Sequence, residues 1–261
     1  SIKATRAWPF RSGRAIRPGF FSDPSVMPLD NAFLARTEGL ESPSMTPEEI
    51  QGRILYRDAL MLVINKPAGI AVHEAHPNAK HRGHHLEQYF PHLMFGLPQP
   101  PMLAHRLDKD TSGCLVLGRH RKALDDLSRL FREGHMEKTY WALVKGGPLE
   151  ESGHIDMPLG KMDRSRGWWM KPDPEGLPAQ TDWRVRGRVG NFAWLELKPE
   201  TGRTHQLRVH CLALGHPILG DPFYASDAAA EYPRMMLHSE ELRLKHPETG
   251  KGLKFRSPAP F

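Results

Sequence analysis

The sequence predicts a mixed α/β domain built on a mostly antiparallel sheet, and three observations support this fold class. Residues 138–145 alternate between polar and apolar side chains, as a half-buried strand does. Residues 121–133 carry apolar side chains at spacings of three and four, which is typical of an amphipathic helix. Residues 178–183 and 192–198 read as two strands that pair antiparallel across Gly187–Gly190.

Composition limits the classes of protein that need to be considered. The chain has 261 residues, enough for one large or two small domains, and a net charge of +6. No apolar run approaches the roughly 18 residues that span a membrane, so no membrane association is expected. A basic balance favours a polyanionic partner such as a nucleic acid. The two cysteines, Cys114 and Cys211, lie in apolar contexts, which favours a reducing compartment over a disulfide framework.

Residues 1–45 are predicted to be a poorly ordered, basic and proline-rich extension, and residues 46–261 the folded domain. No acidic residue precedes Asp23, and five prolines interrupt any periodic pattern. Such a stretch is typical of a solvated tail or of a basic arm that contacts RNA. An organelle-targeting segment is the alternative, so a cytoplasmic location is expected without targeting being excluded.

The folded domain is expected to begin with a short helix and two strands. Thr46 and Pro47 form a helix start, in which Thr46 is the cap. Residues 54–56 and 60–64 read as strands, and the segment 65–69 (NKPAG) reads as a turn.

Six histidines in residues 73–92 raise the possibility of a metal site. However, His73 and His76 are one residue too close for the two histidines of a zinc-binding helix. No cysteine is near enough to complete a structural zinc site. The preferred interpretation is a polar loop that leads into a short helix at residues 86–89, so no metal is expected.

Residues 103–118 (LAHRLDKDTSGCLVLG) are the stretch around which the chain is organised. Arg106 and Asp108 lie on a polar loop that feeds directly into an apolar run, Cys114–Leu117, of the length of one buried strand. Functional side chains are often placed on loops that a rigid element holds. A surface turn with an Arg–Asp pair is the alternative.

Two further segments are informative. Residues 161–171 interleave basic side chains with Trp168 and Trp169, which suits a nucleic-acid contact or a hairpin whose tryptophans pack inward. After a turn at residues 201–205, a helix is expected to run to Leu214, where Gly215 caps it. No glycine-rich phosphate loop is present, which argues against nucleotide-dependent chemistry.

Three of these segments carry a resemblance. HRLDKDTSG (105–113), KTYWALVKG (138–146) and TGRTHQLRVH (201–210) resemble, in this order, the three signature motifs of the RluA family of pseudouridine synthases. The similarity extends over about residues 53–261. It implies the pseudouridine synthase fold, a bent sheet flanked by helices with a central RNA-binding cleft. It also implies isomerisation of uridine within RNA, a reaction that imports no group and needs no cofactor.

The resemblance also implies roles for individual residues. Asp108 corresponds to the catalytic carboxylate, Tyr140 lies beside it, and Arg203 pairs with it. Leu237 helps to hold the target base. Arg106 fills the gap left by a flipped-out base, with a structural ion pair as its alternative. Further substrate contacts are expected from a set of flanking residues: His105, Thr111, Lys138 and Trp169.

The partner is therefore expected to be RNA, bound by a monomer. The segments 176–183 and 212–226 look most like the A-type branch, which modifies large-subunit ribosomal RNA and a transfer-RNA anticodon arm. Two other classes of protein fit the sequence less well. A non-catalytic RNA-binding or chaperone protein has no need of the Asp108, Tyr140 and Arg203 trio. A base deaminase requires a His/Cys zinc site, and Cys114 and Cys211 are far apart.

Overall fold

The computed structural model describes residues 44–74, 84–162, 169–225 and 232–261. Most of the predicted extension (1–43) therefore lies outside the described residues, as do His76, His81 and Trp168. Within the described residues the chain forms two compact units. The first unit comprises residues 44–140 and Leu237–Phe261, and the second comprises Trp141–Met236. The predicted fold class, a mixed α/β protein with a mostly antiparallel sheet, is confirmed.

The first unit is built on strands in the order β1-β2-β4-β11, followed by the beginning of β5. The short strand β3 pairs with β4, and β12 pairs with β11. The strands are β1 (Ile54–Arg57), β2 (Met61–Lys66), β3 (Met102–Leu103), β4 (Ser112–Gly118), β5 (Glu137–Lys145), β11 (Leu237–Lys245) and β12 (Gly252–Arg256). Strand β4 runs parallel to β11, whereas β1 with β2, β2 with β4, β3 with β4 and β11 with β12 pair antiparallel.

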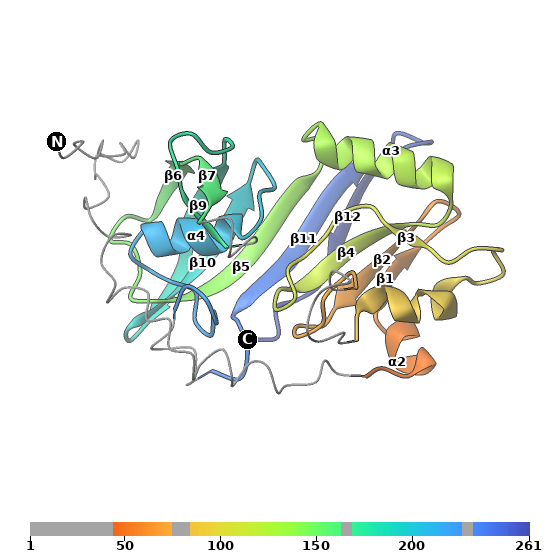
Figure 1. Cartoon of the computed structure of the whole chain (residues 1–261), viewed down its shortest axis with the longest axis horizontal. Helices are drawn as coiled ribbons and strands as arrows, with labels where there is room; N and C mark the ends of the chain where they lie inside the picture. Colours follow the sequence, from red (N-terminus) through yellow and green to blue (C-terminus); the bar gives the residue numbers. More distant parts are fainter. Residues whose placement is uncertain (1–43, 75–83, 163–168, 226–231) are drawn as a thin grey trace. The chain divides into compact units, whose positions relative to one another are not determined.

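Among the described residues, the two α-helices of the first unit begin at residues whose side chains cap them. In α2 (Pro47–Gln51) the Thr46 hydroxyl accepts from the amide of Glu49, and the Glu49 carboxylate accepts from the amide of Thr46, which confirms the predicted cap. Helix α3 (Arg121–Arg132) packs on the sheet of its own unit through Leu127, which contacts a core that includes Val63 and Val116. Figure 1 shows α3 and the strands of this unit. A 3₁₀ helix, η1 (Leu86–Leu93), extends the predicted short helix by four residues.

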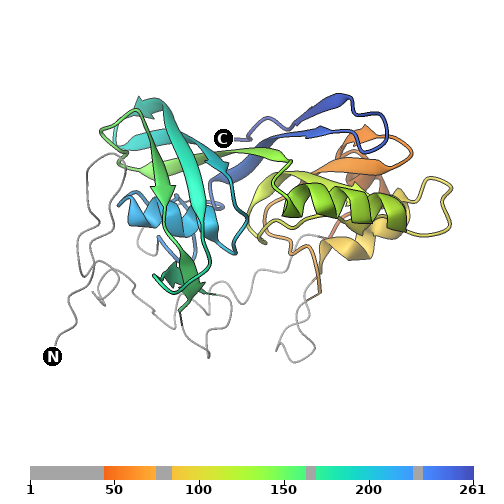
Figure 2. The same cartoon turned by 90° about the horizontal axis from the view of Figure 1, so that it is seen from above.

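The second unit contains the end of β5 and the strand order β5-β10-β9-β6. Its members are β6 (Ser152–Asp156), β7 (Leu159–Lys161), β8 (Met170–Pro172), β9 (Gln180–Val189), β10 (Phe192–Pro199) and the helix α4 (Gln206–Ala213). Strands β7 and β8 form a separate two-stranded sheet. Every residue of α4 is buried. Figure 2 shows α4 lying against the strands of this unit.

The predicted hairpin of β9 and β10 forms, but its turn is shorter and lies later in the sequence than the predicted turn at Gly187–Gly190. Strand β9 continues through Gly187 to Val189, and the turn lies at Gly190 and Asn191. Gly187 marks a register shift, because Trp194 pairs with Gly187 while Leu195 pairs with Val185. A glycine within a strand pattern often marks such a bulge.

A buried ion pair between Arg208 and Asp221 lies in the second unit. The Arg208 guanidinium donates to both Asp221 carboxylate oxygens, from Nε and Nη2, at 2.7 Å each. The Arg208 and Asp221 side chains are 2% and 0% exposed. The same carboxylate accepts from the amides of Phe223 and Tyr224, so its lone pairs are well satisfied.

The helices in the described part of the chain include none that is both long enough and apolar enough to cross a membrane.

We expect Arg208→Met to lower the free energy of unfolding by about 3–5 kcal/mol, because it leaves a buried carboxylate without its counter-charge. Arg129→Met is the matched control, since it breaks the partly exposed pair with Asp126 (2.8 Å) on α3 and should cost far less. Urea titrations of the three proteins measure the difference. Equal losses in both variants would show that burial adds nothing to the Arg208–Asp221 pair.

Candidate active site

The loop between β3 and β4 presents the predicted catalytic residue. The amide of Ala104 donates to the carbonyl of Val116 at 3.1 Å, which fixes the start of the loop against β4. The amide of Thr111 donates to the carbonyl of Asp108 at 3.2 Å and closes the turn before β4. The side chain of Asp108 is half-buried, and that of Arg106 is exposed. Thr111, predicted to contact the substrate, is buried at this turn.

A buried lysine anchors this loop. Lys66, the last residue of β2, is 0% exposed, and its Nζ donates to three backbone carbonyls. These belong to Pro67 (2.8 Å), Lys109 (2.9 Å) and Thr111 (2.9 Å). An ammonium group has three protons to donate, and these carbonyls are among the partners that receive them. Lys66 therefore ties the NKPAG turn to the backbone on the C-terminal side of Asp108. The sequence pattern predicts a turn at Lys66 and gives no sign of this role.

The parallel pairing of β4 with β11 adds a second anchor. His238 pairs with Ser112 and Ser239 pairs with Gly113 along the two strands. The Ser112 hydroxyl and His238 Nδ1 are 2.7 Å apart, and His238 Nε2 lies 2.7 Å from the carbonyl of Ser257. Since that carbonyl can only accept, Nε2 carries the proton and Nδ1 accepts from Ser112.

Gly113 is required at this crossing for two reasons. Its φ of +108° lies outside the range that side chains readily adopt. A Cβ atom there would also collide with the backbone of Ser239. The close approach brings β11, and with it the buried Leu237, to the strand that the Asp108 loop enters.

Tyr140 on β5 lies near Asp108 in the same unit. Burial raises the pKa of its hydroxyl above the usual range, interaction with the Ser239 side chain opposes that rise, and the negative charge of Asp108 adds to it. The phenol is therefore protonated at neutral pH. It can present an apolar ring and a proton donor, but it cannot serve as a phenolate base.

His105 supports the loop from within. Its ring stacks on Phe131 with a centroid distance of 4.0 Å, and its Nε2 accepts from the amide of Val116 at 3.0 Å. Burial, together with the positive charge of Lys138, lowers the pKa of His105 to about 3. Burial also lowers the pKa of Lys138. His105 is therefore uncharged at neutral pH, and its predicted contact with RNA stays a prediction, as does that of Lys138.

Arg203 belongs to the second unit, so its predicted pairing with Asp108 stays a prediction. Within its own unit, Arg203 Nε donates to the carbonyl of Pro178 at 2.9 Å. Its amide donates to the side-chain oxygen of Gln206 at 3.0 Å. Gln206 in turn donates to the carbonyl of Gln180 at 2.8 Å and to the hydroxyl of Thr181 at 3.0 Å. The loop that carries Arg203 is thus held against β9.

Trp169 packs inward, as expected if the tryptophans of residues 161–171 serve the core and do not contact a nucleic acid. It is 6% exposed, and its ring meets Phe223 edge-on at a centroid distance of 5.1 Å. In this conformation Trp169 does not offer a ring face on which a base could stack. The sequence pattern shows aromatic and basic groups together but not the direction in which each aromatic ring points.

Comparison with known proteins agrees with these features. Residues 60–213 match the family of RNA pseudouridylate synthases. The chain belongs to this family. It is 40% identical to the dual-specificity RNA pseudouridine synthase RluA of Escherichia coli over 222 residues, which cover 82% of this chain and 96% of that protein.

Two further relatives extend the comparison. The chain is 42% identical to an RNA pseudouridine synthase of Zymomonas mobilis over 194 residues, 74% of this chain and 87% of the relative. The solved structure of human RNA pseudouridylate synthase domain containing 1 superposes with a TM-score of 0.67 at 30% identity, and covers 84% of this chain and 87% of that one.

The predicted RluA-type family and the predicted enzyme class, an isomerase that acts on RNA, are thus confirmed. The relatives are named as synthases, which favours catalysis over a binding protein that merely kept the fold. The roles of the individual site residues stay predictions.

The lowered pKa of His105 makes a pH-dependent contribution to stability. An unfolded histidine takes up a proton near pH 6.5, whereas folded His105 resists protonation down to about pH 3. Protons therefore favour the unfolded chain in this window, and stability should fall as pH drops below about 6.5. We expect His105→Gln to reduce the loss of unfolding free energy between pH 7 and pH 5 by about 1–2 kcal/mol.

Urea titrations at pH 7, 6 and 5 measure this effect. His135→Gln removes an exposed histidine at the end of α3 and serves as the control, which should keep the wild-type slope. A wild-type slope in His105→Gln as well would contradict the assignment of the effect to His105.

Proposed function

We propose that this synthase converts specific uridines of folded RNA to pseudouridine, with Asp108 as the catalytic carboxylate. The observation that carries the proposal is the setting of Asp108. Its loop is held by the buried ammonium of Lys66, and its charge acts on the buried phenol of Tyr140. Carboxylates that sit on rigidly held loops beside a proton-bearing group are typical of catalytic sites.

The reaction requires that the bond from C1′ to N1 breaks, that the base turns, and that C1′ bonds to C5. A carboxylate can act in two ways. It can attack as a nucleophile, or it can remove the C2′ proton as a general base. The atoms of the uridine are conserved, so neither route needs a cofactor. Both routes require Asp108 to be ionised, and a guanidinium placed beside it favours the ionised form. We assign that part to Arg203.

Tyr140 and Leu237 are proposed to hold the base. Both side chains are buried, and both lie on strands of the first unit, β5 and β11. Because the Tyr140 hydroxyl is protonated at neutral pH, it is suited to support proton movement at C5 as a donor. Leu237 supplies an apolar surface to the other side of the base.

We propose ribosomal RNA, transfer-RNA anticodon arms or both as substrates. The support comes from the relative of E. coli, whose name describes it as dual-specificity and of which the match covers 96%. A uridine in such structured RNA has to be flipped out of its stack before a carboxylate can reach it. We further propose a cytoplasmic location, since its two described cysteines are free, buried thiols suited to a reducing compartment. That the enzyme is a monomer stays a prediction.

The decisive test of the catalytic residue is Asp108→Asn. The amide keeps the shape of the side chain but is neither a nucleophile nor a base, so turnover should fall at least about a hundredfold. Tritium release from RNA that carries 5-tritiated uridine measures turnover, and filter binding should show RNA affinity within a few-fold of wild type. Asp125→Asn, at an exposed site on α3, is the control. Turnover of Asp108→Asn close to that of this control would exclude Asp108 from the chemical step.

Arg106 is proposed to fill the gap left by the flipped base. Its exposed side chain sits two residues from Asp108, and a planar guanidinium can stack on bases. Extruding a stacked nucleotide costs a few kcal/mol, so Arg106→Ala should lower kcat/KM on a stem-loop at least about tenfold more than on an unstructured RNA of the same local sequence.

Two variants sharpen the test of Arg106. Arg106→Lys should rescue poorly, because an ammonium keeps the charge but loses the planar face. Arg121→Ala removes an exposed cation at the start of α3 and should affect both RNAs little. Equal losses of Arg106→Ala on the two RNAs would reject the gap-filling role, and full rescue by lysine would leave Arg106 as a phosphate contact.

A further inference from the structure

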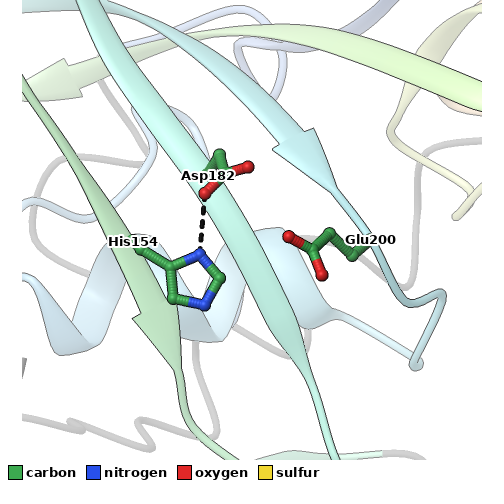
Figure 3. A group of neighbouring side chains, drawn as sticks. All are labelled: His154, Asp182 and Glu200. Carbon is green, nitrogen blue, oxygen red and sulfur yellow. Dashed lines mark hydrogen bonds and ion pairs between the residues drawn. The ribbon is translucent and has the colours of Figure 1, made fainter. Parts of the chain in front are cut away.

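Three side chains with metal-binding chemistry meet on the outer face of the second unit. They are His154 on β6, Asp182 on β9 and Glu200 just after β10. Each offers one ligand atom, and these atoms all lie within 4.8 Å of one another. Figure 3 shows the imidazole and the two carboxylates directed toward a common point.

The strand register places the three residues together. His154 and Asp182 are directly paired across the antiparallel strands β6 and β9. Asp182 pairs with Lys198 on the other side, and Glu200 lies two residues further along, on the same face as Lys198. The amide of Glu200 donates to the carbonyl of Gln180 at 3.0 Å. The backbone at all three positions is thus held by hydrogen bonds, which limits movement to the side chains.

The charges at this place call for a cation. The Asp182 and Glu200 carboxylates repel each other, and no arginine or lysine of the described residues forms an ion pair with either. Two basic side chains line the same groove: Arg184, two residues from Asp182 on β9, and Lys198, across from Asp182 on β10. Nζ of Lys198 faces Glu196 at 3.7 Å. Asp182 is bound by His154, at 2.7 Å from Nδ1 to Oδ1.

We propose that His154, Asp182 and Glu200 form a binding site for a divalent first-row transition cation such as Zn²⁺. An imidazole nitrogen with carboxylate oxygens suits Zn²⁺, whereas Mg²⁺ and Ca²⁺ prefer oxygen ligands alone. Zinc bonds to such atoms at about 2.0–2.2 Å, so in its tetrahedral geometry ligand atoms lie roughly 3.3–3.6 Å apart. Side-chain rotations therefore have to open the 2.7 Å contact of His154 with Asp182 and bring the wider separations, which are within 4.8 Å, closer. The short His154–Asp182 hydrogen bond opens, and the ion takes the place of its proton.

A bound ion would brace two segments of the second unit. Strand β6 is the last strand in the order β5-β10-β9-β6, and the ion would tie it to β9 through side chains as well as through backbone hydrogen bonds. Glu200 lies three residues before Arg203 in the sequence, so the ion would also fix the start of the Arg203 loop. With three protein ligands at a partly exposed site, water completes the coordination and the ion exchanges readily.

Calorimetric titration of Zn²⁺ into the metal-stripped, untagged full chain tests the site. We expect one saturable site that Glu200→Gln and His154→Gln each weaken by about tenfold or more. Asp156→Asn is the matched control, since it removes an exposed carboxylate two residues from His154 on the same strand. Its affinity for Zn²⁺ should stay at the wild-type value. Circular dichroism of each variant checks that it is folded.

A second measurement needs no variant. In the wild-type chain, a titration with Zn²⁺ followed by NMR should shift the imidazole signals of His154 before those of the other histidines. Absence of saturable binding below about 1 mM, some 4 kcal/mol of affinity, would overturn the proposal. So would undiminished binding by both ligand variants, or a first shift at another histidine. Neither measurement depends on pseudouridine formation, so its failure is separate from any failure of the proposed function.

Discussion

The buried ammonium of Lys66 is the constraint on which the candidate active site depends. A charged group that is removed from water costs several kcal/mol unless it is fully hydrogen-bonded. Here the carbonyls of Pro67, Lys109 and Thr111 must therefore all remain aimed at Nζ. Any movement of the Asp108 turn that takes these carbonyls away would leave a buried charge without hydrogen bonds. The cost in free energy stabilises the turn in one conformation. The same turn delivers the chain into β4, every residue of which is buried.

The pairing of β4 with β11 brings residues that are distant in the sequence close to the Asp108 loop. Ser112 and His238 are far apart in sequence and meet through a 2.7 Å hydrogen bond. The contact requires the backbones to approach so closely that only glycine fits at position 113. Through this pairing, and through β5 beside β11, Tyr140 reaches the neighbourhood of Asp108. The order of the chain therefore gives no direct measure of which residues share the site.

Local chemistry explains which parts of the fold could be predicted from the sequence. The cap at Thr46 and the amphipathic pattern of α3 depend on neighbours within a few residues, so their positions were predicted to within one residue. The bulge at Gly187, the inward packing of Trp169 and the clamp by Lys66 depend on partners that pairing brings from elsewhere. The strands β6, β7, β8 and β12 were missed for the same reason, since each is short and is stabilised by its partner strand.

Not every basic side chain near Asp108 can contact RNA, so counting residue types alone gives too many RNA contacts. The basic side chains in and beside the loop differ in their environments. The ammonium of Lys66 is buried and donates to backbone carbonyls, and His105 is neutral because burial and Lys138 lower its pKa to about 3. Arg106 and Lys109 are exposed. A phosphate or an unstacked base gains most from a cation that water can reach and that needs no rearrangement. Direct contact with RNA at this loop should therefore rest on Arg106 and Lys109, while Lys66 and His105 act through the backbone that they hold.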